Sequence, residues 1–223
     1  MVGLVVVAAA FHAAFNVWVY HGYDLLYVWL PIVLPPLWAV IPAPTSVERN
    51  GHTMDLKSHV REIQDFPIPG ILFRDITTVL KEPTALKGAI DAMAKAVEGL
   101  AFDTVLGPES RGFIFGVPLA YNMGKGFVPV RKAGKLPGDV VAKEYALEYG
   151  TATIEIHKDA ITPGQRFIIA DDLLATGGTA KAVVDLVNQM GGIVVAHVYF
   201  IELEGLGGRE ILAGEDVRTV LQY

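Results

Sequence analysis

The sequence predicts an α/β domain in which a central, mostly parallel and twisted sheet is flanked by helices on both faces. Four short apolar runs bounded by glycine are typical of buried strands, and they cover residues 104–106, 127–130, 167–170 and 193–201. Helix-like segments separate most of these runs. Such an alternation of strand and helix gives parallel strands with helices covering both faces of the sheet.

The predicted domain covers residues 54–223, because the character of the chain changes near residue 50. Before Glu48 the only formally charged side chain is Asp24, and all three tryptophans lie in this early stretch. Residues 1–53 therefore form a hydrophobic N-terminal extension with three open interpretations: a membrane anchor, a hydrophobic arm packed on a partner, or upstream sequence translated from a start codon placed too early. Membrane contact is expected only through this extension, whose apolar runs approach the roughly 20 residues of a spanning helix.

Composition excludes several classes of function. A formal net charge of -6, without a basic helix or an arginine-rich arm, gives no electrostatic footprint for nucleic acid. The absence of cysteine excludes disulfides, thiolate metal sites and a cysteine nucleophile, and it agrees with a reducing, cytoplasmic compartment. The six histidines show no metal-ligand spacing, so a metal site built by the protein alone is not expected.

Three further elements are predicted along the domain. Residues 55–65 form a short polar helix that ends before the prolines of FPIPG. From Thr84 onward apolar residues recur at helical spacing, which predicts an amphipathic helix facing the core. In residues 151–157 the apolar positions alternate with Thr153, Glu155 and His157, as in a half-exposed strand.

The strongest chemical signal is a strand, a turn and a helix between residues 167 and 190. The predicted strand brings Asp171 and Asp172 to its carboxyl end, where ligands of open α/β sheets bind. The turn that follows supplies small residues, hydroxyls and backbone N–H groups at a helix N-terminus, which suits a phosphate monoester; its residues are Ala175, Thr176, Gly177, Gly178 and Thr179. A structural glycine-rich turn capped by a carboxylate is the alternative interpretation. The turn lacks the Gly-Lys-Ser/Thr of a P-loop, which disfavours nucleoside triphosphate hydrolysis.

The string DDLLATGGT, residues 171–179, resembles the motif that binds phosphoribosyl pyrophosphate (PRPP) in the type I phosphoribosyltransferases, in the form typical of their adenine branch. The resemblance runs from about Met54 to Tyr223. It implies the fold of that family, a twisted sheet with a small N-terminal hood over the base site. It also implies that Asp171 and Asp172 hold the ribose hydroxyls while residues 175–179 hold the 5′-phosphate, in keeping with the acceptor and donor character of these groups.

Two further motifs resemble the family's pyrophosphate sites. In GPESRGF, residues 107–113, Arg111 is implied to contact pyrophosphate. VRKAGKLPG, residues 130–138, resembles the next signature of the family. A leaving group with several phosphate charges needs nearby cations, so Arg131, Lys132 and Lys135 are candidate partners of pyrophosphate, and Lys135 joins Arg111 among the catalytic groups. A solvated basic face is the alternative interpretation.

Residues 137–150 are similar to the family's flexible lid, which keeps water from the reactive ribosyl cation. The resemblance implies that Glu148 in this lid is the acid/base and that Tyr149 contacts PRPP. Near the start of the domain, FPIPGILFRDIT matches the hood of the adenine branch. There Leu72 is implied to meet adenine partly through its backbone, Phe73 to belong to the same apolar wall, and Arg74 to lie beside the base.

The implied reaction joins adenine to the ribose-phosphate of PRPP, giving AMP and pyrophosphate. The resemblance also implies Mg²⁺ held mainly by substrate oxygens, and a homodimer. Two alternatives stay open: a PRPP-binding regulator that reuses the fold without its chemistry, and a phosphoribosyltransferase for another purine such as xanthine or guanine. The lid residues Glu148 and Tyr149 would be unnecessary in a regulator.

Overall fold

The computed structural model describes residues 55–146 and 150–223. Contacts between residues divide the chain into two units, Met1–Thr53 and Met54–Tyr223, and the fold described below belongs to the second unit. The predictions for residues 1–53 and for Glu148 and Tyr149 lie outside the described residues. Within the two described ranges, no helix has the length and apolar character needed to cross a bilayer.

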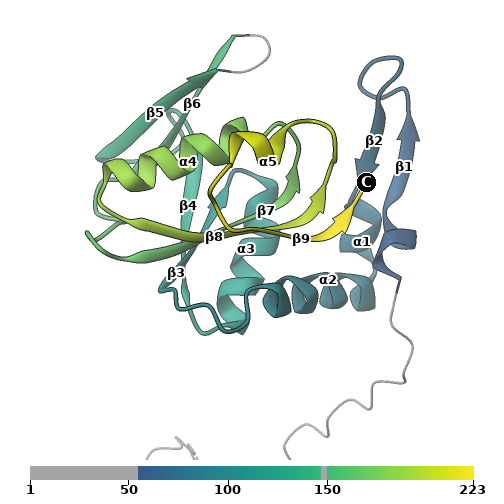
Figure 1. Ribbon diagram of the computed structural model, residues 1–223, viewed down its shortest axis with the longest axis horizontal. Coiled ribbons are helices and arrows are strands. Elements are labelled where there is room, and N and C mark those ends of the chain that lie inside the picture. Colours follow the sequence, from purple (N-terminus) through teal and green to yellow (C-terminus); the bar gives the residue numbers. More distant parts are fainter. Residues whose placement is uncertain (1–54, 147–149) are drawn as a thin grey trace, which may run out of the picture. The chain divides into compact units, whose positions relative to one another are not determined.

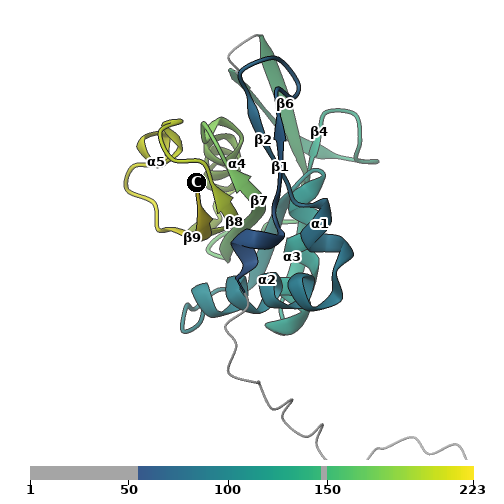
Figure 2. The same cartoon turned by 90° about the vertical axis from the view of Figure 1, so that its right-hand side faces the viewer.

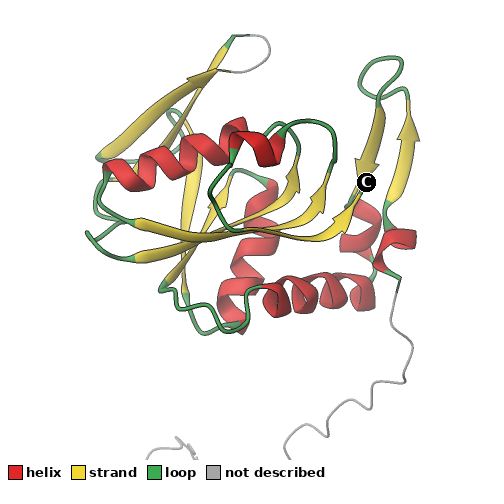
Figure 3. Cartoon of the chain, viewed as in Figure 1, coloured by secondary structure: helices red, strands yellow, loops and turns green. Residues whose placement is uncertain are grey.

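A seven-stranded sheet forms the centre of the described domain, with the strand order β5-β6-β4-β3-β7-β8-β9 (Figures 1 and 3). Its five parallel strands are β3 (Thr104–Pro108), β4 (Gly126–Lys132), β7 (Arg166–Leu174), β8 (Ile193–Glu202) and β9 (Val217–Gln222). The hairpin of β5 (Val140–Ala146) and β6 (Thr151–His157) continues the sheet beyond β4 in antiparallel pairing. The prediction of a mostly parallel sheet is therefore confirmed.

Helices cover both faces of this sheet, as Figure 2 shows. On one face lie α1 (Thr77–Lys81), α2 (Pro83–Ala96) and α3 (Arg111–Asn122), and on the other lies α4 (Gly178–Gln189), followed along the chain by the short α5 (Gly208–Ile211). Strand β7 shows how one apolar run serves two cores. Its Ile168 and Ala170 belong to the cluster with α2 and α3, while Phe167 and Ile169 belong to the cluster with α4.

The amphipathic helix expected from Thr84 onward is α2. Its buried side chains are Ala85, Ala89, Ile90 and Met93, which repeat at helical spacing. The helix begins where its sequence predicts, because the Glu82 carboxylate accepts a 2.6 Å hydrogen bond from the Ala85 N–H and Pro83 occupies the first turn.

The prediction of a polar helix over residues 55–65 is wrong. The chain forms a 3₁₀ turn, η2 (Leu56–His59), and then the strand β1 (Arg61–Gln64), which pairs in antiparallel register with β2 (Leu72–Asp75). Opposite charges face each other across this hairpin, because Arg61 pairs with Asp75 and Arg74 pairs with Glu62. These cross-strand ion pairs favour the hairpin over the local helical preference of a polar segment.

The structure of β6 also differs from expectation. Residues 140–146 of the predicted lid form β5, which pairs along its whole length with β6. Strand β6 does not simply alternate between a buried and an exposed face, since Glu155 is only 4% exposed. Its carboxylate is buried because backbone N–H groups of a neighbouring turn solvate it.

Candidate active site

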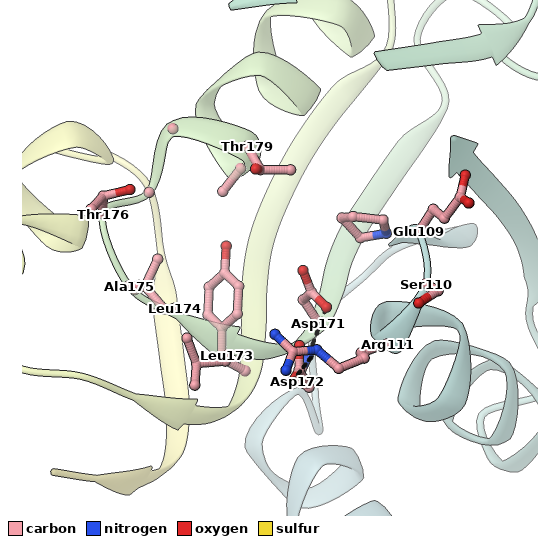
Figure 4. A pocket seen from close by; sticks show the side chains of 15 residues that line it. Glu109, Ser110, Arg111, Asp171, Asp172, Leu173, Leu174, Ala175, Thr176 and Thr179 are labelled. Carbon is pink, nitrogen blue, oxygen red and sulfur yellow. Dashed lines mark hydrogen bonds and ion pairs between the residues drawn. The ribbon is translucent and has the colours of Figure 1, made fainter. Parts of the chain in front are cut away.

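The carboxyl ends of β3 and β7 form the site, at the point where the sheet order reverses. The connection through α3 leads from β3 to β4 on one side, whereas β7 lies on the other side of β3. Ligands of open α/β sheets bind at such switch points. A cavity of about 220 Å³ opens here (Figure 4). It is lined by residues 108–111, from the end of β3 to the start of α3, by residues 171–180, from β7 through the following loop to α4, and by Tyr199 of β8.

Two adjacent carboxylates and one guanidinium occupy the floor of this cavity. Asp172 is 3% exposed, and its Oδ2 lies 3.0 Å from Arg111 Nε without the geometry of a hydrogen bond. Burial and the neighbouring charge of Asp172 raise the pKa of Asp171 well above its usual range. Burial also raises the pKa of Asp172, and the charge of Arg111 opposes that rise. Two carboxylates therefore lie beside one guanidinium, that of Arg111, and the pKa values of both are raised. Such shifted pKa values are typical of functional sites.

Arg111 reaches the carboxylates because α3 approaches β7 closely at Gly112. A Cβ at this position would lie 3.0 Å from the Ala170 carbonyl oxygen and 3.0 Å from Asp171 Oδ1. A larger residue would have to push these neighbours away, whereas glycine lets the first turn of α3 bring Arg111 beside Asp172, as Figure 4 shows.

The loop after β7 meets the cavity with the N-terminus of α4. Gly177 caps this helix in the left-handed region, with φ +80°, and a Cβ there would lie 2.9 Å from the carbonyl oxygen of Gly208. The contact is reciprocal, because a Cβ on Gly208 would lie 2.4 Å from the Ala175 carbonyl oxygen. The start of α5 thus packs against the loop. The first N–H groups of an α-helix have no acceptor within the helix, so those of α4 are hydrogen-bond donors of the kind that bind anions.

The predicted basic residues lie at the end of β4 and just after it, outside the lining of this cavity: Arg131 and Lys132 are the last two residues of the strand, and Lys135 lies on the turn that follows. Arg131 Nε donates a 3.1 Å hydrogen bond to Glu109 Oε2, and Arg131 Nη1 donates to the Lys135 carbonyl oxygen at 3.1 Å. The hydrogen bond from Arg131 lowers the pKa of Glu109, which does line the cavity. Glu109 therefore connects the basic turn with the cavity wall, while pyrophosphate contacts of Arg131, Lys132 and Lys135 stay predictions.

Known proteins match both the sequence and this geometry. The model of the phosphoribosyl transferase domain matches residues 75–206. An adenine phosphoribosyltransferase of Lachnoclostridium phytofermentans is 59% identical over 168 residues, which are 75% of this chain and 97% of that protein. The chain belongs to the adenine phosphoribosyltransferase family.

Solved structures of the family share the fold. The crystal structure of adenine phosphoribosyltransferase from Thermoanaerobacter pseudethanolicus has a TM-score of 0.74 at 53% identity and covers 75% of this chain and 98% of its own. The enzyme of Saccharomyces cerevisiae, solved with adenine and an imino-altritol bisphosphate, has a TM-score of 0.70 at 41% identity; the match covers 74% of this chain and 96% of that one. The recognition of the family from its motifs is confirmed.

The hood residues expected in an adenine phosphoribosyltransferase lie on β2 and do not line the 220 Å³ cavity. Leu72 is 37% exposed, and the Phe73 ring packs edge-on against Phe66 at 5.1 Å between centroids. The Arg74 guanidinium pairs with Glu62 and lies 4.0 Å from the centre of the Tyr223 ring. Contacts of these three residues with adenine stay predictions.

Tyr199 is a residue of the enzyme's cavity that sequence reasoning missed. It pairs with Asp171 across β7 and β8, and its hydroxyl lies 3.1 Å from His197 Nδ1. Burial raises the pKa of Tyr199 well above its usual range, so the phenol is neutral at physiological pH. In sequence Tyr199 is one aromatic residue inside an apolar strand, and only the register of β8 against β7 reveals its place.

Proposed function

We propose that this adenine phosphoribosyltransferase binds PRPP at the carboxyl ends of β3 and β7, transfers its 5-phosphoribosyl group to adenine, and releases AMP and pyrophosphate. One observation supports this assignment above all others. A single cavity combines two carboxylates with the N-terminus of a twelve-residue helix. Carboxylates accept hydrogen bonds from sugar hydroxyls and helix N–H groups donate to phosphate, so the cavity matches both parts of a ribose phosphate.

The loop of Ala175, Thr176, Gly177, Gly178 and Thr179 would hold the 5′-phosphate. Backbone N–H groups and two hydroxyls at the start of α4 are donors, and the positive end of the helix dipole favours a dianion. Thr179 Oγ1 lies 3.1 Å from the Tyr145 hydroxyl, which links the loop to β5. Asp171 and Asp172 would accept hydrogen bonds from the ribose hydroxyls on the floor of the same cavity.

Cations on the opposite side of the cavity would bind the pyrophosphate. Arg111 is half exposed and borders the cavity, so its guanidinium has donors left for phosphate oxygens. Lys132 ends β4, where its N–H donates to Glu109 of the cavity wall, and Lys135 lies on the turn that follows. Charge neutralisation by Arg111 and Lys135 would favour departure of the leaving group, which is their catalytic contribution.

Bond cleavage at the anomeric carbon would develop oxocarbenium character while N9 of adenine attacks the opposite face, as in glycoside cleavage. The hood residues Leu72, Phe73 and Arg74 would hold the base. Glu148 would take the proton on the N9 side or stabilise the charged base through N7, and Tyr149 would contact PRPP. The predicted lid, residues 137–150, would exclude water from the ribosyl cation.

The carboxylates also fit a shared Mg²⁺. Asp172 Oδ2 is buried and has no hydrogen-bond partner among residues 55–146 and 150–223, and Asp171 lies beside it. Mg²⁺ commonly takes one or two carboxylate oxygens and completes its shell with phosphate oxygens and water. No group of three or more His, Cys, Asp or Glu in the described part of the chain forms a protein cage. When bound, the ion would neutralise charge on the leaving pyrophosphate.

The purified enzyme is expected to form AMP from adenine, PRPP and Mg²⁺. Chromatography of the products should show AMP with adenine and none with xanthine or guanine at equal concentrations. Removal of Mg²⁺ by EDTA should abolish turnover, and added Mg²⁺ should restore it. Product from xanthine or guanine in place of adenine would assign the enzyme to another purine, and PRPP binding without any turnover would indicate a regulator.

We also propose a homodimer, supported by an apolar stripe on α3. Ile114, Val117 and Tyr121 lie at helical spacing and are 39%, 48% and 84% exposed. Sedimentation should give twice the 24.1 kDa mass of one chain, and Val117→Glu should shift the particle towards that single mass. A wild-type protein that sediments as one chain at micromolar concentration would contradict the dimer.

A cytoplasmic location is proposed as well, because PRPP and AMP carry charged phosphates that do not cross a bilayer unaided. The nature of residues 1–53 stays a prediction with the same three interpretations. Mass mapping of the N-terminus of the native protein tests them, since a protein that starts at Met54 excludes both the anchor and the arm.

A further inference from the structure

Glu155 is a buried carboxylate outside the proposed PRPP contacts. It lies on β6, is 4% exposed, and accepts three backbone hydrogen bonds from the turn after β4. Its Oε2 accepts from Gly134 N at 3.1 Å, and its Oε1 accepts from Lys135 N and Leu136 N at 2.9 Å each. In the described part of the chain, no lysine or arginine forms an ion pair with it.

The three donors are successive backbone N–H groups, which all point to the same side of a tight turn. Gly134 adopts φ +78°, which is the left-handed conformation that such a turn requires. Successive N–H groups in a turn form a concave anion site. Here the anion is a side chain of the protein itself, and the N–H groups lower the pKa of Glu155, with Leu136 contributing most. The carboxylate and the turn therefore stabilise each other's geometry.

A second carboxylate, Glu109, holds the end of β4, just before the turn, from the side of the cavity. Glu109 Oε2 accepts from the Lys132 N–H at 3.1 Å and from Arg131 Nε at 3.1 Å. The backbone between Arg131 and Leu136 is thus fixed between Glu109, which lines the cavity, and Glu155 on β6. Among the described residues, the ammonium groups of Lys132 and Lys135 form no ion pair, so both remain available to an external anion.

We propose that Glu155 is a positioning residue that fixes the turn after β4, and thereby Lys132 immediately before the turn and Lys135 within it, for the pyrophosphate group of PRPP. The inference rests on the proposed function, which supplies the pyrophosphate. Rigid placement of cations matters here, because ground-state and transition-state stabilisation of a polyanion depends on preorganised charges. A flexible turn would have to order its backbone on binding, which reduces affinity. Glu155 touches neither the base nor the ribose site, so its effect is specific to pyrophosphate.

The test compares Glu155→Gln with Thr151→Ala, an exposed position on the same strand that serves as the matched control. The glutamine keeps one carbonyl acceptor but places an NH₂ group against at least one of the turn N–H groups. We expect KM for PRPP and the inhibition constant of pyrophosphate to rise about tenfold, as for the loss of one charge-assisted hydrogen bond. KM for adenine should stay within about twofold, and Thr151→Ala should match the wild type in all three values.

Two results would overturn the inference. One is unchanged affinity of Glu155→Gln for both PRPP and pyrophosphate, and the other is an equal rise of KM for adenine and PRPP, which a general structural defect would produce. Should Glu155→Gln be insoluble, Glu155→Asp must show the same selective loss, because it keeps the charge but withdraws it by one methylene. Failure of the proposed function is distinguishable, since the wild-type enzyme would then form no AMP at all.

Discussion

Replacing Asp171 by asparagine is expected to stabilise the ligand-free enzyme and at the same time to weaken PRPP binding. Asp171 and Asp172 face a single cation, Arg111, and burial together with mutual repulsion raises the pKa of Asp171. A neutral asparagine leaves a balanced pair of Asp172 and Arg111, and its carbonyl oxygen can still accept the 2.8 Å hydrogen bond from the Asp172 N–H. We expect a gain of about 0.5–2 kcal/mol in the free energy of unfolding.

The same substitution removes the proposed charged acceptor of the ribose hydroxyls. Hydrogen bonds to charged groups contribute roughly 1.5–3 kcal/mol, so kcat/KM for PRPP should fall about 10- to 150-fold. Thermal unfolding without ligand should show a rise in Tm of about 2–4 °C for each kcal/mol gained. A gain in stability together with a loss of activity would show that these carboxylates serve ligand binding and lower the stability of the ligand-free enzyme.

The pH dependence of stability supplies the control. A carboxyl whose pKa is raised on folding destabilises the folded state once it ionises. Its penalty is therefore absent at acid pH and develops as pH rises through the window between the unfolded pKa, near 4, and the raised folded pKa. The difference in Tm between Asp171→Asn and wild type should be small at the acid end and largest at neutral pH. A constant difference, or a loss of stability in the mutant at neutral pH, would show that the pair is not strained.

The strand, loop and helix of residues 167–190 could be predicted because their signals are local in sequence. A buried strand, two carboxylates, glycine at the left-handed cap Gly177 and a helix pattern follow one another within residues 167–190. Each of these features depends on its immediate neighbours in the chain, so the sequence alone is sufficient. The predicted end of the strand differs from the structure, because β7 continues through Leu174 and both carboxylates lie inside the strand.

The errors arose where partners distant in sequence decide the structure. The hairpin of β1 and β2 depends on pairing between Arg61 and Asp75, and a polar segment of four residues gives no strand signal by itself. The alternating pattern of residues 151–157 predicts an exposed Glu155, because its three N–H partners lie about twenty residues earlier in the chain. Tyr199 joins the cavity only through its register with Asp171. Sequence periodicity reports the burial of apolar side chains, whereas these polar contacts depend on tertiary register.

The contacts that support the loop of residues 175–179 also could not be predicted from the sequence. Gly207, Gly208 and Arg209 precede and begin a helix of only four residues, yet Gly208 packs against the Ala175 carbonyl, and Arg209 pairs with the buried Glu202 at 2.6 Å. That ion pair holds the turn at the end of β8, next to the end of β7. A glycine in a short loop has no pattern that distinguishes a close contact from simple flexibility, so only the structure shows why glycine is needed there.

Replacing Glu148 by glutamine is expected to reduce kcat by roughly 10²–10⁴, the range of a lost general acid or base. Glu148 itself lies outside the described residues, but β5, the strand that precedes it, lies beside the start of α4. The Tyr145 hydroxyl lies 3.1 Å from Thr179 Oγ1, and the Ala146 carbonyl oxygen would lie 3.7 Å from a Cβ on Gly178. The end of β5 therefore contacts the start of α4, and only Leu147 separates Ala146 from Glu148 in sequence.

The substitution separates proton transfer from binding because glutamine has nearly the shape of glutamate and retains an acceptor oxygen. KM for PRPP should change little, while the limb of the kcat–pH profile that reports this carboxyl should disappear. Glu144→Gln is the matched control, since Glu144 is an exposed carboxylate on the same strand and should retain wild-type turnover. Near-normal kcat in Glu148→Gln would exclude proton transfer by this residue. Catalysis would then depend on charge neutralisation by Arg111 and Lys135 and on orientation of adenine.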